Sequence, residues 1–153
     1  MERLPPDHGE LCWLVAWVGV GVATATVLAL AGEARQVESV WDGVYSEQQA
    51  DRGELLYRAV CESCHAPDLS GGKVVPELVG ETFTEDWDGL MVGQLFELVL
   101  LSMPEGDPAS VSSREKVDIL SFILRANGFP AGNMDLQVQQ DVLNAVRFEV
   151  VKP

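Results

Sequence analysis

Apolar residues recur with helical spacing in three stretches of the chain, and polar loops separate these stretches. The first opens at Ser46-Glu47-Gln48-Gln49, which has the form of a capping box, and its apolar members are Ala50, Leu55, Leu56, Ala59 and Val60. The second runs from Asp86 to Ser102. The third opens at another capping box, Ser112-Ser113-Arg114-Glu115, and should end at Asn127-Gly128. The pattern predicts an all-α fold, with residues 66–82 as a loop rich in Gly and Pro.

A fourth apolar run, Leu11 to Ala31, carries no charge, and its 21 residues are about long enough to cross a bilayer core. Trp13 and Trp17 favour a retained transmembrane helix, whereas Ala29-Leu30-Ala31 resembles a signal-peptidase site. Both interpretations stay open, and both place the rest of the chain outside the cytoplasmic membrane. The expected organisation is a signal peptide or anchor (1–31), a polar linker (32–45), the main domain (46–132) and a tail (133–153).

The most specific chemistry lies in Cys61-Glu62-Ser63-Cys64-His65. Two thiols three positions apart, followed at once by a histidine, are the attachment pattern of a c-type haem. The thiols add to the two haem vinyl groups, and the imidazole binds the iron. A redox dithiol would stand in a βαβ pattern, which is absent here. A zinc site would need a fourth ligand, and the only other Cys and His, Cys12 and His8, lie in the first 31 residues.

The second axial position of such an iron has three candidate sulfur ligands, those of Met91, Met103 and Met134. Met103 follows an apolar helix and precedes Pro104 and Gly106, which should place it on a loop that can bend over a buried haem. Met91 falls inside the helical run, where methionine is more often a core residue. An open position would instead indicate a haem enzyme or gas sensor. The pattern favours His65 and Met103 as the axial pair.

From about Gln48 to Gly132 the chain resembles the class I c-type cytochromes of the small bacterial kind. The matching pieces stand in the family's order: Gly53-Glu54-Leu55-Leu56-Tyr57, the Cys-x-x-Cys-His run, Pro76-Glu77-Leu78-Val79-Gly80, Met103-Pro104 and Val117 to Leu124. The resemblance implies a cytochrome c fold with three core helices around one covalently bound haem c, preceded here by the apolar N-terminal segment. It also implies that the Pro76 carbonyl accepts the His65 ring N–H, and that Gly53 and Tyr57 meet Phe122.

The formal net charge of −14 disfavours nucleic acid as a partner and favours redox proteins with basic docking surfaces. No catalytic acid–base pair is evident, so we expect an electron carrier rather than an enzyme, on the periplasmic side of the cytoplasmic membrane. The alternative is an electron-accepting cytochrome subunit of a quinone-cofactor dehydrogenase or another oxidoreductase complex, such as a respiratory one. The stretch Asn127-Gly128-Phe129-Pro130-Ala131-Gly132 is weakly similar to cytochromes that accompany such dehydrogenases.

Overall fold

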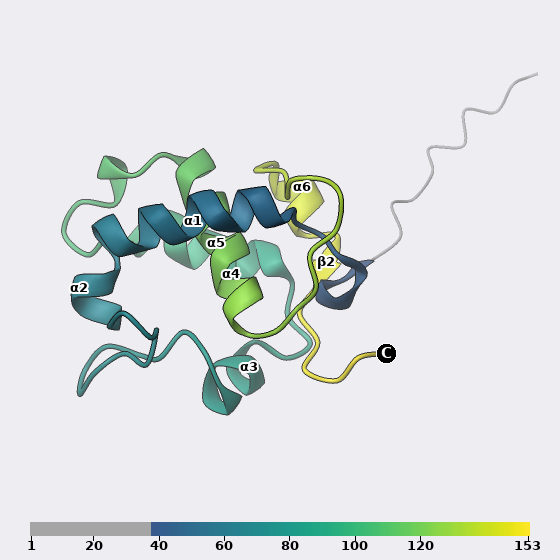
Figure 1. Cartoon of the computed structure of the whole chain (residues 1–153), viewed down its shortest axis with the longest axis horizontal. Helices are drawn as coiled ribbons and strands as arrows, with labels where there is room; N and C mark the ends of the chain where they lie inside the picture. Colours follow the sequence, from purple (N-terminus) through teal and green to yellow (C-terminus); the bar gives the residue numbers. More distant parts are fainter. Residues whose placement is uncertain (1–37) are drawn as a thin grey trace, which may run out of the picture. The chain divides into compact units, whose positions relative to one another are not determined.

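The computed structural model describes residues 38–153, which form a mostly helical domain (Figure 1). Two very short strands join near-terminal parts of this region, and they pair in parallel. The elements in chain order are β1 (Glu38–Ser39), η1 (Val40–Asp42), α1 (Glu47–Val60), α2 (Glu62–His65), α3 (Glu81–Trp87), α4 (Val92–Ser102), η2 (Pro108–Ser110), α5 (Ser113–Ala126), α6 (Gln140–Leu143) and β2 (Val146–Arg147).

The crossing of α1 and α5 is the main helix pair of the domain. Gly53 makes the crossing close, because a Cβ at this position would lie 1.9 Å from the carbonyl oxygen of Asp118. The rings of Tyr57 and Phe122 pack with centroids 5.3 Å apart, so the expected contact between Tyr57 and Phe122 is confirmed, and Gly53 lies at the same crossing against Asp118. The capping box at Ser112 is also confirmed, and α5 ends at Ala126, ahead of a left-handed Gly128.

The buried side of α1 differs from the one expected. Gln49, Ala50, Gly53 and Tyr57 are buried, whereas Leu55 is 72% exposed and Val60 is also exposed. Buried positions three and four residues apart lie on one side of a helix, and that side faces α5. The helix was correctly expected, and Ala50 is buried as expected, but Leu55, Ala59 and Val60 lie off the packed side.

The helix expected over residues 86–102 begins later than predicted: residues 86 and 87 are the end of a separate helix, α3, and the expected helix itself is α4, which starts at Val92. The two helices are separated at Asp88–Met91, where Gly89 has a left-handed φ of 77°. A positive φ is incompatible with a right-handed α-helix, and glycine adopts it at little cost. One helix therefore ends before Gly89 and the next begins after it. Trp87 is the last residue of α3, and its ring packs 6.5 Å from that of Phe83 rather than inside a longer helix.

Residues expected as linker and tail supply part of the core. Val40 and Tyr45 are fully buried. From the other end of the domain come four more buried apolar side chains: Leu136, Leu143, Val146 and Phe148. The Trp41 ring donates its N–H to the carbonyl of Glu149 at 2.9 Å, so the two segments are held together by side-chain as well as strand contacts. The tail is therefore part of the packed domain.

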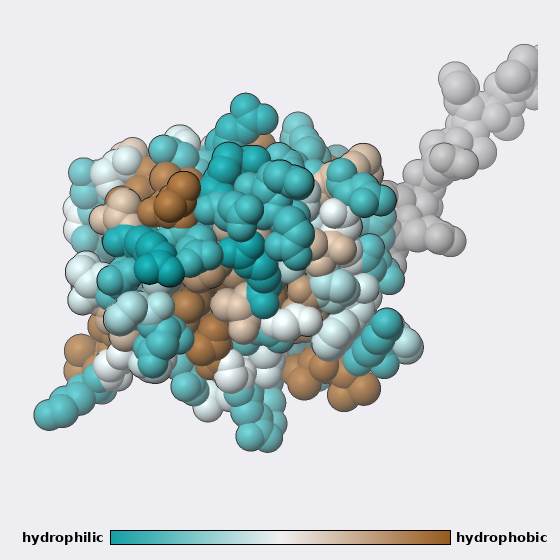
Figure 2. Space-filling model, in the orientation of Figure 1, coloured by the Kyte–Doolittle hydropathy of each residue, from teal (hydrophilic) through white to brown (hydrophobic). Residues whose placement is uncertain are grey.

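On the face drawn in Figure 2 the surface is mainly hydrophilic, with separate apolar areas among the polar side chains. Among residues 38–153, none of the helices has the length and apolar character needed to cross a membrane. The candidate anchor or signal peptide, Leu11 to Ala31, lies outside the described residues.

Candidate functional site

The Cys-x-x-Cys-His run begins where α1 ends. Cys61 caps α1, and its carbonyl accepts hydrogen bonds from the backbone N–H groups of Cys64 (3.1 Å) and His65 (3.0 Å). Ala66, with a left-handed φ of 66°, ends this single turn. Both thiols are free, with Cys61 half-buried and Cys64 exposed. The turn thus presents two unpaired sulfur atoms immediately ahead of an imidazole.

The imidazole of His65 is buried and held in one orientation. Its Nδ1 lies 3.0 Å from the carbonyl oxygen of Pro76. A carbonyl can only accept, so Nδ1 must carry the proton, and Nε2 is left with a free lone pair. This is the contact that the resemblance implied, and it is the arrangement in which an imidazole binds a metal through Nε2.

The loop that brings Pro76 to His65 depends on Gly71. Its N–H donates to the His65 carbonyl at 2.9 Å, and its φ is 67°. A Cβ here would lie 2.5 Å from the carbonyl oxygen of Val75. Any other residue would therefore push the loop away from the histidine.

Tyr57 ties α1 to the same site. Its hydroxyl donates a hydrogen bond to the Ala66 carbonyl at 2.5 Å. Burial, with smaller contributions from nearby acidic groups and Cys61, raises the pKa of Tyr57 to about 12. The hydroxyl thus remains a donor at neutral pH and holds the residue that follows the histidine.

The three candidate methionines occupy very different places. Met103 is the half-buried C-cap of α4, and its N–H donates to the Val99 carbonyl at 3.1 Å. Met91 is the N-cap of the same helix, so at 1.5 Å per residue the two lie about 18 Å apart along its axis. Met134 is 78% exposed. One iron site can include only one end of α4.

The electrostatics associate Cys61 with the Met103 end of α4. Burial raises the pKa of the Cys61 thiol to about 11, the Cys64 thiol raises it further, and the ammonium group of Lys116 lowers it. That ammonium donates to the carbonyl of Leu100 at 2.9 Å, in the last turn of α4. Lys116 therefore lies near both Cys61 and the Met103 end of α4. In Figure 1, α2 and the green segment between α4 and α5 lie toward the same side of the domain.

The groups at this site suit a haem c. The soft sulfur atoms of Cys61 and Cys64 are free thiols, and because Nδ1 of the buried His65 ring is bound to Pro76, its Nε2 is left to bind a metal. Met103, which carries a thioether, is the C-cap residue of α4. Thiol, imidazole and thioether are the donors that attach and ligate a haem iron.

Comparison with protein families gives one match. The model of the family described as "Cytochrome C oxidase, cbb3-type, subunit III" matches residues 48–123. Residues 48–123 form a c-type cytochrome domain. A search of curated proteins found no match. The cytochrome domain implies haem binding and electron transfer, and the matched stretch contains Cys61, Cys64, His65, Pro76 and Met103.

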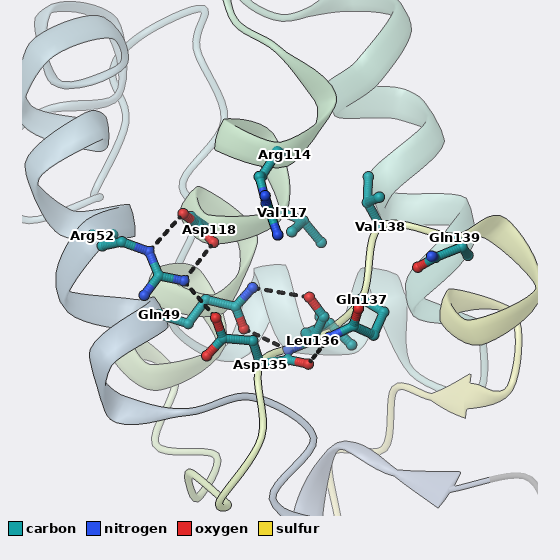
Figure 3. Close-up of a pocket in the computed structure, with 10 residues that line it drawn as sticks. All are labelled: Gln49, Arg52, Arg114, Val117, Asp118, Asp135, Leu136, Gln137, Val138 and Gln139. Carbon is teal, nitrogen blue, oxygen red and sulfur yellow. Dashed lines mark hydrogen bonds and ion pairs between the residues drawn. The ribbon is translucent and has the colours of Figure 1, made fainter.

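A polar cavity of about 290 Å³ lies elsewhere on the cytochrome domain and contains none of these five residues (Figure 3). Arg52 of α1 reaches across it to Asp118 of α5 at 3.0 Å and to Asp135 of the tail at 2.7 Å. Gln49 exchanges two hydrogen bonds with the backbone of Leu136. The side chains of Arg52 and Gln49 are thus bound to partners on α5 and the tail, so the cavity lies where the tail docks on α1 and α5.

Two residues of the cytochrome domain were missed by sequence reasoning. Gln49 was interpreted as part of a capping box, but its amide binds the tail instead, and Ser46 alone caps α1. Lys116 gave no signal, because a lysine in the first turn of an amphipathic helix is ordinarily solvent-exposed. In the structure Lys116 is 1% exposed.

Proposed function

We propose that this chain is a one-haem c-type cytochrome that carries single electrons between redox partners outside the cytoplasmic membrane. The observation that carries the proposal is the geometry at His65. Its Nδ1 is committed to the Pro76 carbonyl at 3.0 Å, its Nε2 is free, and two unpaired thiols precede it. We assign Cys61 and Cys64 to the two thioether links, with His65 and Met103 as the axial ligands.

In this proposal each residue has a defined task. Pro76 holds the proton on Nδ1, which fixes the tautomer and increases the basicity of the nitrogen that binds iron. Met103 would bind the iron of such a haem through its thioether. A haem ligated by His and Met has a raised reduction potential, and with both axial positions filled it can exchange electrons without binding a substrate.

Exposed apolar side chains support a bound macrocycle. Val74, in the loop after the motif, is 94% exposed, and Leu98 and Leu101, in the last turns of α4, are 51% and 69% exposed. Such surface is costly to leave in water. A flat, apolar group placed between the motif and the Met103 end of α4 would cover surface of this kind.

Covalent attachment is tested directly by haem staining of a denaturing gel and by a pyridine spectrum. We expect haem to stay with the wild-type chain and with Ser63→Ala, a matched change at an exposed position inside the motif. Cys64→Ala should give a severely reduced holoprotein yield, because it removes one of the two links. Extraction of all haem from the wild type by acid acetone would contradict covalent attachment.

A second candidate function is an electron-accepting cytochrome subunit of a quinone-cofactor dehydrogenase or another oxidoreductase complex. The matched family is described as a subunit of a cytochrome oxidase, which favours a subunit role. A redox titration with visible spectra, made on both membrane and soluble fractions, reports haem type, spin state and location together. Stable co-purification with an oxidoreductase would favour the second candidate, and a free low-spin cytochrome would favour the first.

A further inference from the structure

Lys116 is a charged residue that is buried near the N-terminal end of a helix, where a cation is unfavourable. It lies in the first turn of α5, beyond the N-cap Ser112, and only 1% of it is exposed. The N-terminal end of a helix repels a cation, and burial disfavours the charged form of an amine. Desolvation accordingly lowers the pKa of Lys116. In the part of the chain that the structure describes, no carboxylate forms an ion pair with it.

Two backbone carbonyls offset these costs. The Nζ of Lys116 donates to the carbonyl of Leu100 at 2.9 Å and to that of Pro108 at 2.7 Å. The Leu100 carbonyl lies in the last turn of α4, where carbonyls lack partners within the helix and the helix dipole favours a cation. The hydrogen bond from Lys116 therefore satisfies a carbonyl at the end of α4 that would otherwise lack a partner.

The two carbonyls that Lys116 binds lie on either side of Met103 in the chain. Leu100 lies just before the end of α4, and Pro108 is the first residue of η2. Between the two elements lies the Met103 loop, which we define as residues 103–107. A single ammonium group thus joins the two sides of the loop that carries the proposed distal ligand.

We propose that Lys116 is a positioning residue for the distal ligand, whose buried ammonium group fastens both sides of the Met103 loop and so keeps the Met103 sulfur where it would bind the iron of a haem. The inference rests on the proposed haem function. It adds a residue on a different helix, which acts through the backbone on either side of the loop.

Lys116→Met tests this in the holoprotein, because it keeps an unbranched apolar side chain and removes the charge and all three donors. Exogenous imidazole must displace Met103 to reach ferric iron, so loosening the loop should make imidazole bind more tightly. Because hydrogen bonds from a charged donor are lost, we expect the imidazole dissociation constant to fall by about tenfold or more. The far-red absorption band of methionine-ligated ferric haem should weaken in the same variant.

Lys152→Met, the same substitution at an exposed position of the tail, is the matched control and should bind imidazole as the wild type does. If Lys116→Met yields no holoprotein, Lys116→Gln replaces it, since its amide can still donate to one carbonyl. Wild-type imidazole affinity and an unchanged band in the variant would overturn the inference, even if the reduction potential moved. Such a shift alone would reflect only the lost charge. Absence of the band in the wild type would instead refute Met103 ligation itself.

Discussion

At the scale of single residues, Met103 and Met91 cap opposite ends of α4, and only the Met103 end is associated with Cys61. The link is Lys116, which is hydrogen-bonded to Leu100 and acts on the pKa of the Cys61 thiol. Met91 lies at the other end, where it forms a bridge with Arg147 in β2. The placement supports Met103 as the distal ligand over the other methionine of the same helix.

Met103→Ala should therefore lower the reduction potential, because loss of the thioether removes a ligand that stabilises ferrous iron. Axial ligands tune haem potentials over several hundred millivolts, so we expect a fall on the order of 100 mV, measured by redox titration. The ferric iron should also become open to cyanide. Met91→Ala is the matched control and should change neither property. The ligand assignment is wrong if Met91→Ala opens the iron and Met103→Ala does not.

At the scale of elements, the α1–α5 crossing positions the Cys-x-x-Cys-His run, since Cys61 follows directly from the end of α1. The contact at Gly53 is with backbone atoms of Asp118, which cannot rotate away as a side chain could. Arg125 of α5 adds ion pairs to Glu47 (3.3 Å), Asp51 (2.7 Å) and Glu54 (2.8 Å) along the exposed edge of the pair. The acidic partners at Glu47 and Asp51 are exposed and add little individually, whereas the close approach at Gly53 is a fixed steric requirement of the crossing.

Gly53→Ala should destabilise the domain by about 1–3 kcal/mol, the usual cost of overpacking, because α1 and α5 must move apart. Gly72→Ala is a suitable control, since nothing lies within 4 Å of the added methyl group. Chemical denaturation of the two holoproteins measures the difference. Equal free energies of unfolding for the two variants would contradict a tight crossing at Gly53.

At the scale of the whole molecule, the C-terminal segment is fastened to the cytochrome domain across a large sequence separation. Gln49 binds the backbone of Leu136, and Arg52 binds Asp135 (Figure 3). The Ser46 hydroxyl donates to the Asp135 carboxylate as well. This hydroxyl, followed by Arg52, lowers the pKa of Asp135. The docked tail thus favours the ionised carboxylate.

A lowered folded-state pKa means that this docking contributes stability above the unfolded pKa of about 3.9 and loses it as pH falls through the folded value. Urea denaturation at a series of pH values from neutral down to about 3 should show a loss of wild-type stability below pH 4. Asp135→Asn should be less stable at neutral pH, and its stability should fall less in acid. The effect should be modest because the Asp135 side chain is 43% exposed.

Met134→Ala is the control for this experiment, since it changes the adjacent, exposed residue and removes no charge. Its stability should follow that of the wild type at every pH. Identical pH profiles for Asp135→Asn and the wild type would show that the carboxylate does not contribute to tail docking.

The sequence by itself determined the features whose causes lie within a few residues. Cys61, Cys64 and His65 match the pattern of haem attachment, and the structure confirms that one short turn carries all three groups. The capping box at Ser112 and the end of the helix at Asn127-Gly128 depend on hydrogen bonds and backbone angles that span about one turn. Resemblance supplied two longer-range contacts, between His65 and Pro76 and at the α1–α5 crossing, and both are present.

Only the tertiary structure decided the features that depend on distant partners. Gln49 could cap its own helix or bind a segment 87 residues away, and the buried backbone of Leu136 was the partner it took. Leu55 is apolar yet exposed, because α5 packs on a different side of α1. Lys116 is polar yet buried, because two carbonyls brought together by the fold satisfy its ammonium group. A local pattern states what a residue prefers, but burial and hydrogen bonding over such distances depend on which groups the complete fold brings within reach.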